Sequence, residues 1–275
     1  MSQTILITGC SSGIGYTCAH GLHKLGYTVF ATCKDEVDVK RLQSEGLHAH
    51  RLDLCESESL QSALQWMLAK TNGHIDVLFN NGAYGQPGAV EDLSRNVLKE
   101  QFETNVFGTQ ELTNLVIPYM RKQGSGRIIY NSSILGFVAM SYRGAYNASK
   151  FAIEGLADTL RLELHESGIK VVLIEPGPIR SQFRQNALAK FLANIDQEHS
   201  AHKDIYAKTL SRLQKSGDAP FTLGTDAVLK VLIQAIEAKK PKIRYGVTFP
   251  TKLFAVLKRI FPTWLMDTIA RKASE

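Results

Sequence analysis

The sequence is poor in cysteine and proline and has no long apolar segment. Its 275 residues include four cysteines and eight prolines. The cysteines, at positions 10, 18, 33 and 55, form no Cys-x-x-Cys pair, so we expect reduced thiols and neither a disulfide framework nor a zinc site. No apolar run approaches the roughly 20 residues of a membrane span, and no secretion-signal pattern is present. We therefore expect a cytoplasmic protein.

The sequence also lacks a metal-binding pattern and a nucleic-acid-binding motif. Its eight histidines are scattered, so we predict no catalytic metal. The net charge is +6 and the isoelectric point about 9.1, but the basic residues are dispersed. We expect no nucleic-acid partner. An anionic cofactor, or an anionic membrane surface near the C-terminus, explains the positive charge at least as well.

Short β-branched runs alternate with segments of helical periodicity. Strands are predicted at 4–8, 28–33, 48–53, 76–80, 126–133, 169–176 and 242–247, and helices at 14–25, 37–45, 57–69, 97–120, 146–165 and 225–238. Gly26 should end the first helix, and Ser57 should be the N-cap of the third. The alternation predicts one α/β domain over residues 1–275, a doubly wound parallel sheet that binds ligands at the carboxyl ends of its strands. Its parts would be a cofactor-binding core (1–180), a helical lid (about 181–222) and a C-terminal helical extension (about 250–275).

A glycine-rich loop follows the first predicted strand. The stretch TGCSSGIG places Gly9, Gly13 and Gly15 between a strand and a helix. Glycine there lets the backbone turn tightly and approach a pyrophosphate, which the helix N-terminus stabilises. A turn without a ligand is the alternative, but the strand–loop–helix context favours dinucleotide binding.

The end of the second predicted strand bears on the choice of dinucleotide. NAD-binding folds place an acidic residue there for the ribose 2′-hydroxyl, whereas this chain has Cys33 followed by Lys34. A lysine can pair with the 2′-phosphate of NADP, and Ser11 and Ser12 could add hydroxyl donors. We therefore favour NADP(H), with NAD(H) as the alternative. The simpler interpretation of Lys34 is a solvated surface lysine.

A serine–tyrosine–lysine set follows the fifth predicted strand. Tyr146 and Lys150 are one helical turn apart and share a helix face. A neighbouring ammonium should lower the pKa of the phenol, which could then exchange a proton with a carbonyl or alcohol oxygen. Ser132 or Ser133 could hold the same oxygen. The alternative is an amphipathic helix with an incidental tyrosine and lysine.

These motifs, in this order, resemble the short-chain dehydrogenase/reductase family along essentially the whole chain. NNGAYG resembles the family's Asn-Asn-Ala-Gly motif with Gly82 and Ala83 exchanged, and the spacing from serine to tyrosine selects Ser133. The resemblance is closest to bacterial NADP-dependent aldehyde and ketone reductases and to retinol and 17β-hydroxysteroid dehydrogenases. It implies a Rossmann-type fold with about seven strands and a homodimer or homotetramer. It also implies hydride transfer between NADP(H) and a carbonyl or alcohol, in which Asn105 anchors a water leading to Lys150. The apolar side chains of the lid and the tail suggest that this substrate is hydrophobic.

The resemblance also assigns cofactor contacts. Asp53 would hold the adenine amine, the Asn80–Gly82 segment would pass the ribose, and the Pro176–Ser181 segment would face the nicotinamide. The full expected set is Gly9, Ser11, Ser12, Gly13, Ile14, Gly15, Lys34, Asp53, Leu54, Asn80, Asn81, Gly82, Tyr146, Lys150, Pro176, Gly177, Ile179 and Ser181. Two alternatives stay open: an NAD-linked hydroxysteroid or retinol-type dehydrogenase, and a catalytically idle NADP-binding protein that acts by association.

Two segments lie outside the motifs. Residues 182–221 are polar with scattered aromatics and are expected to form a helical lid over the substrate, or else a passive surface excursion. In the tail, apolar residues recur near 253, 257, 260, 264 and 269 beside lysines and arginines, and Pro262 should divide the segment into two helices. Docking on the core or on a partner subunit is the simpler interpretation, and contact with a membrane surface is the alternative.

Overall fold

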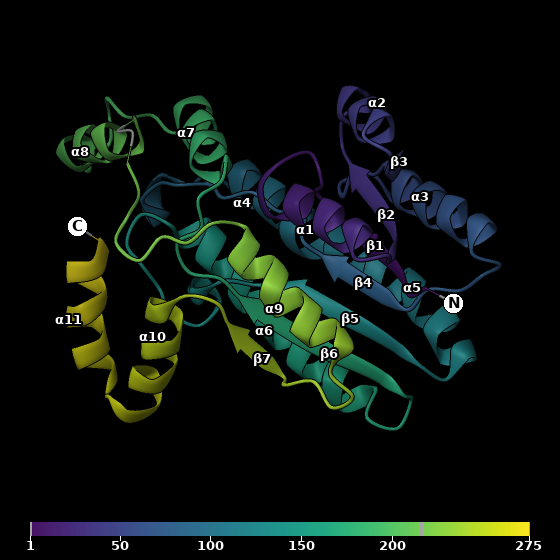
Figure 1. Cartoon of the computed structure of the whole chain (residues 1–275). Coiled ribbons are helices and arrows are strands. Elements are labelled where there is room, and N and C mark those ends of the chain that lie inside the picture. The colour runs from purple at the N-terminus through teal and green to yellow at the C-terminus, as the bar shows by residue number, and fades with distance from the viewer. Residues whose placement is uncertain (1, 215–216, 275) are drawn as a thin grey trace.

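The computed structural model describes residues 2–214 and 217–274. In this part of the chain, seven parallel strands form one sheet in the order β3-β2-β1-β4-β5-β6-β7 (Figure 1). The strands are β1 (Thr4–Ile7), β2 (Thr28–Cys33), β3 (His48–Arg51), β4 (Val77–Asn80), β5 (Gly126–Asn131), β6 (Ile169–Glu175) and β7 (Arg244–Gly246). The expected Rossmann-type fold with about seven strands is confirmed.

Helices cover both faces of this sheet. They are α1 (Gly13–Lys24), α2 (Glu36–Ser44), α3 (Ser57–Lys70), α4 (Arg95–Phe102), α5 (Thr109–Gln123), α6 (Gly144–Glu163), α7 (Phe183–Asn194), α8 (Lys203–Gln214), α9 (Asp226–Glu237), α10 (Phe249–Ile260) and α11 (Thr263–Ser274). Ile5 and Ile7 pack against α1, α2 and α9, whereas Leu6 packs against α3, α5 and α6. Because successive strand side chains alternate between faces, the strands are apolar throughout and supply two cores.

Helices α1 and α9 pack closely although some 200 residues separate them. A Cβ atom added at Gly21 would lie 2.2 Å from Leu229 Cδ2. The hydroxyls of Thr17 and Thr225 are hydrogen-bonded at 2.7 Å. The face of the sheet that carries the glycine-rich loop is therefore completed by a helix from the C-terminal part of the chain.

The predicted continuous helix over 97–120 is wrong. The structure has α4, then the π-helical segment η2 (Glu103–Gly108), then α5, and the run begins at Arg95 and ends at Gln123. A π-helical segment inserts an extra residue without a glycine or proline signal, so the apolar pattern does not reveal it. The predicted N-cap Ser57 is also off by one residue, because Glu56 occupies that position.

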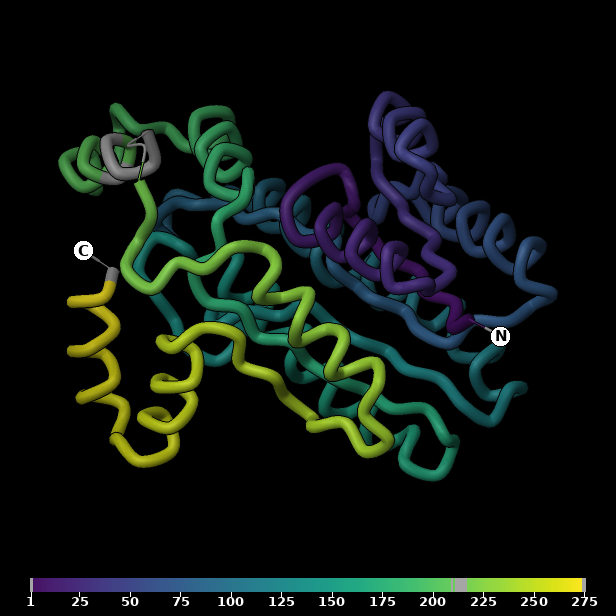
Figure 2. The backbone as a smooth tube through the Cα atoms, in the orientation of Figure 1, coloured from purple at the N-terminus to yellow at the C-terminus, as the bar shows by residue number. Residues whose placement is uncertain are grey.

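Two helical additions follow β6. Helices α7 and α8 occupy most of the 181–222 segment, and α10 and α11 fold back on each other around Pro262, as predicted (Figure 2). Both additions lie at the end of the molecule opposite the N-terminus. None of the helices in the described ranges is long and apolar enough to traverse a bilayer.

Candidate active site

The carboxyl ends of three neighbouring strands are tied together by one side chain. The amide nitrogen of Asn81 donates to the carbonyls of Thr8 (2.9 Å) and Gly9 (3.1 Å), and its oxygen accepts from Asn131 Nδ2 (2.9 Å). These bonds join the ends of β1, β4 and β5. Asn80 instead points to the opposite face, where it donates to Thr113 of α5 (2.9 Å). The structure therefore brings Asn81, but not Asn80, to the expected cofactor edge.

The loop between β1 and α1 has a backbone that favours glycine. Gly9 and Gly13 have positive φ angles of 71° and 59°. A Cβ atom at Gly15 would lie 2.1 Å from the Gly9 carbonyl oxygen, so a side chain cannot fit there. Ser12 is the N-cap of α1 but makes no side-chain cap bond. The helix start thus keeps amide groups for an anion such as a pyrophosphate, and the residues present fit a dinucleotide.

Lys34 and Asp53, expected to contact different parts of the cofactor, pair with each other. Lys34 Nζ lies 2.9 Å from Asp53 Oδ2, and Asp53 Oδ1 accepts from the Cys55 amide (3.0 Å). Burial opposes ionisation of Asp53, but the Cys55 and Lys34 bonds outweigh it and lower its pKa. The Lys34 side chain is 65% exposed, so a competing anion can reach it.

Arg41, from α2, is a second cation at the glycine-rich loop. Its guanidinium donates to the Ser11 carbonyl (2.6 Å) and to Asp38 (2.7 Å), and it lies 5.4 Å from the centre of the Tyr16 ring. Sequence reasoning missed Arg41, because it belongs to no motif and reaches the loop only through the packing of α2.

The structure brings Ser133, Tyr146 and Lys150 together beyond the end of β5. The Ser133 hydroxyl lies beside the Tyr146 phenol, close enough to lower its pKa, and accepts from the Leu135 amide (3.1 Å). Lys150 Nζ lies 5.6 Å from the Tyr146 ring centre and donates to the Asn131 carbonyl (2.7 Å).

The alternative serine, Ser132, is not part of this set. Its hydroxyl donates to Glu154, further along α6. Since adjacent residues leaving a strand point in opposite directions, only one of the two serines can face the phenol. The geometry selects Ser133, as the spacing did.

The expected lowering of the Tyr146 pKa is wrong. Burial raises the pKa of this phenol, and the nearby Ser133 hydroxyl only partly opposes the effect. Burial also lowers the pKa of Lys150 to about 8, against the attraction of Glu154. Both groups lie in the same poorly hydrated surroundings, which favour the neutral form of each. The phenol therefore keeps its proton at neutral pH.

Asn105 lies in the π-helical segment η2. Its side chain accepts from the Tyr84 amide (3.1 Å) and donates to the Tyr84 carbonyl (2.9 Å) and to Ser149 Oγ (3.0 Å). The side chain thus fixes the loop after β4 against α6 and makes no direct bond to Lys150. A water relay through Asn105 stays a prediction.

The turn after β6 closes the same edge. The Pro176 carbonyl accepts from the Ile134 amide (2.8 Å), which joins this turn to the end of β5. Gly177 packs against Thr248, whose hydroxyl would lie 2.2 Å from an added Cβ. Ser181 faces the glycine-rich loop, since a Cβ at Gly13 would lie 3.1 Å from Ser181 Cβ. Ile179 packs into the core on the α1 side.

The lid and the tail supply apolar neighbours of the catalytic phenol. Phe183 of α7 lies edge-on to the Tyr146 ring, with 5.3 Å between ring centres. Tyr146 also borders an apolar cluster formed by Ile134, Leu135, Phe137, Val138, Met140, Phe254, Met266 and Ile269. The last three come from α10 and α11. Sequence reasoning did not assign these contacts.

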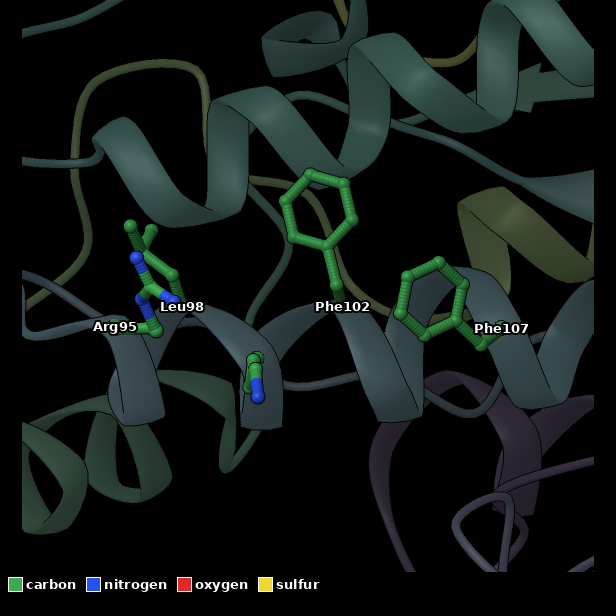
Figure 3. Close-up of a pocket in the computed structure, with 5 residues that line it drawn as sticks. Arg95, Leu98, Phe102 and Phe107 are labelled. Atoms are coloured by element: carbon green, nitrogen blue, oxygen red, sulfur yellow. The ribbon is translucent and has the colours of Figure 1, made fainter.

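Two surface hollows lie apart from the catalytic set. One, of about 470 Å³, is lined by Arg95, Leu98, Lys99, Phe102 and Phe107 of α4 and η2 (Figure 3). The other, of about 450 Å³, includes Val90, Tyr142 and His202. Tyr142 packs edge-on against His202 and Tyr206, so it belongs to the contact between the body and α8.

A profile of the short chain dehydrogenase family matches residues 3–191. The chain belongs to this family. The oxidoreductase is 40% identical over 269 residues to the uncharacterized oxidoreductase YbbO of Escherichia coli (strain K12), an alignment that covers 98% of this chain and 94% of YbbO. It is 34% identical over 277 residues to 3-ketodihydrosphingosine reductase of Bacteroides thetaiotaomicron (98% and 96% covered). It is 31% identical over 274 residues to retinol dehydrogenase 8 of Homo sapiens (94% and 85% covered).

A solved structure of a family member agrees with the fold of this short-chain dehydrogenase. The short chain dehydrogenase/reductase from Burkholderia phymatum, in complex with NAD, superimposes with a TM-score of 0.77 at 25% identity, covering 93% of this chain and 92% of that one. The predicted family and its retinol-dehydrogenase-like branch are confirmed.

Proposed function

We propose that this protein is a cytoplasmic NADP(H)-dependent oxidoreductase that reduces hydrophobic aldehydes or ketones to alcohols. The observation that carries the proposal is the convergence of Ser133 and Lys150 on the Tyr146 phenol, next to the glycine-rich loop. A protein that only binds a dinucleotide has no need of a half-buried phenol between a hydroxyl and an amine.

The residues divide the work of carbonyl reduction. A bound nicotinamide supplies the hydride. Ser133 would hold the carbonyl oxygen, and Tyr146 would give that oxygen its phenolic proton. Because burial raises the pKa of Tyr146, the phenol carries its proton at neutral pH, as reduction requires. Lys150, whose pKa is about 8, is mostly protonated at pH 7 and would stabilise the resulting phenolate.

Two cations support NADP over NAD. Lys34 directly follows the end of β2, which ends in Cys33 rather than in an acid, and Arg41 donates to the Ser11 carbonyl of the glycine-rich loop. A 2′-phosphate would replace Asp53 as the partner of Lys34. Asp53 would keep its bond from the Cys55 amide and could then accept from the adenine amine, which reconciles the two expected roles.

The surroundings of Tyr146 support an apolar substrate. Phe183, Met140, Phe254 and Met266 offer it carbon and sulfur rather than charge. Two relatives are named 3-ketodihydrosphingosine reductase and retinol dehydrogenase 8. The compounds in these names, 3-ketodihydrosphingosine and retinol, are both largely apolar molecules. We infer a carbonyl or alcohol on a hydrocarbon skeleton.

We also propose a homodimer or homotetramer. The hollow on α4 and η2 is lined by the exposed Phe107, by Phe102 and by Arg95, a mixture of aromatic and arginine side chains that is enriched at protein interfaces (Figure 3). Light scattering of the purified protein would measure its mass. A monomer at micromolar concentration would contradict this part of the proposal.

Fluorescence titration of the purified protein with NADPH and NADH, side by side, tests the cofactor assignment. We expect tighter binding of NADPH, followed by consumption of NADPH when a panel of apolar aldehydes and ketones is added. Tighter binding of NADH would favour the NAD-linked retinol-type alternative. NADPH binding without turnover of any carbonyl would favour the idle, regulatory alternative.

A further inference from the structure

The α10–α11 hairpin has apolar side chains on its outside as well as its inside. On the inside, Phe254, Met266 and Ile269 join the cluster beside Tyr146. On the outside, α10 exposes Phe249, Leu253, Val256 and Ile260, which we call the outer stripe. A helix that only docks on its own protein has no need of the second set.

The outer stripe is continuous along α10. Its residues are spaced by four, three and four positions, so at about 100° per residue they fall on one side of the helix, opposite Phe254. Trp264, 69% exposed, extends the apolar surface past the Pro262 turn, and Phe221 adds a ring centred 5.3 Å from that of Phe249. Soluble monomers rarely expose a contiguous apolar patch of this kind without a partner.

The charges around the outer stripe are mostly positive. Residues 249–274 contain five cations, Lys252, Lys258, Arg259, Arg271 and Lys272, and a single acid, Asp267, a net charge of +4. Lys258 is also exposed, but its ammonium is already occupied, because it donates to the Phe137 carbonyl. The other four cations are exposed, and no carboxylate among the described residues forms an ion pair with them.

The positions of these cations match the apolar surface. Lys252 and Arg259 lie along one edge of the outer stripe, three and ten residues after Phe249. Arg271 lies on the same side of α11 as Trp264, two turns away. A second copy of this chain would bring two such cationic faces together, which is unfavourable. An anionic phospholipid surface complements both the charge and the apolar side chains.

We propose that the outer stripe and Trp264 dock this protein on the surface of an anionic phospholipid bilayer. The apolar side chains would enter the boundary between headgroups and acyl chains, and the four cations would contact the lipid phosphates. The hairpin would lie on the membrane without crossing it.

Docking would place the catalytic residues beside the lipid. The inner face of the same hairpin borders Tyr146, and Phe221 extends the outer surface toward the lid. A carbonyl compound dissolved in the bilayer could then reach the site without crossing bulk water. This consequence rests on the proposed function, whereas the docking itself does not.

Vesicle binding, monitored through Trp264, tests the docking. The chain has two tryptophans, and Trp66 packs against Phe30 in the body, so Trp66→Phe leaves Trp264 as the only reporter. With vesicles of phosphatidylcholine and phosphatidylglycerol, we expect cosedimentation and a blue shift of Trp264 emission. Pure phosphatidylcholine should bind at least tenfold more weakly, and added salt should weaken binding to the anionic vesicles.

Variants assign the binding to the outer stripe. Val256→Asp with Ile260→Asp should lower the vesicle partition coefficient at least tenfold, and Arg271→Gln or Lys272→Gln about fivefold each. Leu25→Asp, a change at an equally exposed leucine at the end of α1, is the matched control and should bind as the parent does. Circular dichroism checks folding. If the double Asp variant does not fold, Val256→Ser with Ile260→Ser replaces it.

Several results would overturn the proposal. The first is the absence of binding to anionic vesicles. The second is a loss of vesicle binding in Leu25→Asp as large as that in the outer-stripe variants, and the third is parental binding by the outer-stripe variants. A fall in oligomer mass on Val256→Asp, measured without lipid and accompanied by no vesicle binding, would identify the stripe as a contact between copies. The assay contains neither cofactor nor carbonyl, so a failure of the proposed enzymatic function would leave its result unaffected, and the reverse also holds.

Discussion

The two sides of the catalytic edge are built from different interactions. On the cofactor side, Thr8, Gly9 and Asn81 meet through backbone and amide hydrogen bonds, and glycine is required where no Cβ fits. On the substrate side, Tyr146 meets the lid and tail through Phe183 and the apolar cluster. Hydrogen bonds and close backbone contacts demand particular residues at particular spacings, whereas apolar contacts accept many residues. The chemistry is therefore encoded in motifs, and the substrate is not.

Removal of the Tyr146 phenol should have the largest effect on activity. Tyr146→Phe should reduce carbonyl reduction about a thousandfold or more, because no other group donates the proton, while NADPH affinity changes little. Steady-state rates and fluorescence titration measure the two. Tyr142→Phe, four residues earlier and packed against α8, is the control and should keep most activity. Turnover surviving in Tyr146→Phe would show that the motif does not carry the chemistry.

The substrate side also holds a charge cluster whose disruption should cost stability. Arg244 of β7 contacts Glu154 (3.0 Å), Asp158 (2.7 Å) and Glu175 (3.2 Å), and both glutamates are buried. Arg244→Ala would remove the cation that contacts both glutamates and should lower the free energy of unfolding by about 3–5 kcal/mol. Arg161→Ala, at a more exposed pair with Asp158, should cost less than about 1 kcal/mol.

The Arg244→Ala defect should depend on pH. Burial raises the pKa of Glu175 to about 7, above its unfolded value, so the folded state binds the extra proton between these values. The stability that this proton gives is lost as pH rises through about 7. Urea unfolding should therefore show a smaller defect near pH 6 than near pH 8. The same defect at both would argue that the cluster acts through packing alone.

On the cofactor side, reversing the charge of Lys34 at the end of β2 tests the preference for NADPH over NADH. Lys34→Asp should shift the ratio of NADPH to NADH affinity toward NADH by about tenfold to a hundredfold. The substitution removes the ammonium that would bind the 2′-phosphate of NADPH and adds a carboxylate that can accept a hydrogen bond from the ribose 2′-hydroxyl of NADH. Arg41→Ala should weaken NADPH binding about fivefold. Lys40→Asp, an exposed lysine on α2, is the control for net charge. An unchanged ratio in Lys34→Asp would contradict the NADP assignment.

The smallest expected effect is in the pH profile of reduction. Because burial lowers the pKa of Lys150 to about 8, the ammonium that stabilises the nascent phenolate is lost as pH rises through that value. We expect the reduction rate to fall severalfold between about pH 7 and pH 9. Lys150→Arg keeps its charge over this range and should lack the inflection, even if its rate is lower. An inflection that persists in Lys150→Arg would have to come from another group.

The difference between hydrogen-bonded motifs and apolar contacts also explains how much of the structure could be predicted from the sequence. The doubly wound parallel sheet, the glycine-rich loop and the meeting of Ser133, Tyr146 and Lys150 were predictable, because each depends on local patterns and spacings in the sequence. The π-helical segment around Asn105 was not, because it leaves no mark in the apolar pattern. The raised pKa of Tyr146 was missed because burial arises from segments distant in the chain, such as α7 and α10.

The pair formed by Lys34 and Asp53 was missed for a related reason. Each residue was assigned from its own strand end, and β2 and β3 are neighbours in the sheet, so their ends meet. Arg41 likewise reaches Ser11 only because α2 packs beside the loop. Contacts between side chains from different motifs need the assembled sheet, and a single motif does not contain them.

The packing of α9 on α1 has a consequence for how the protein is made. Thr17 and Gly21 of α1 contact Thr225 and Leu229 of α9, which are synthesised some 200 residues later. Until α9 is synthesised, part of the apolar surface of α1 stays exposed to solvent, where it can bind other nascent chains. Domains built on such distant contacts fold slowly and are prone to aggregate while incomplete. We expect chains that terminate before α9 to be captured by chaperones or degraded, although every motif of the catalytic edge is already present in them.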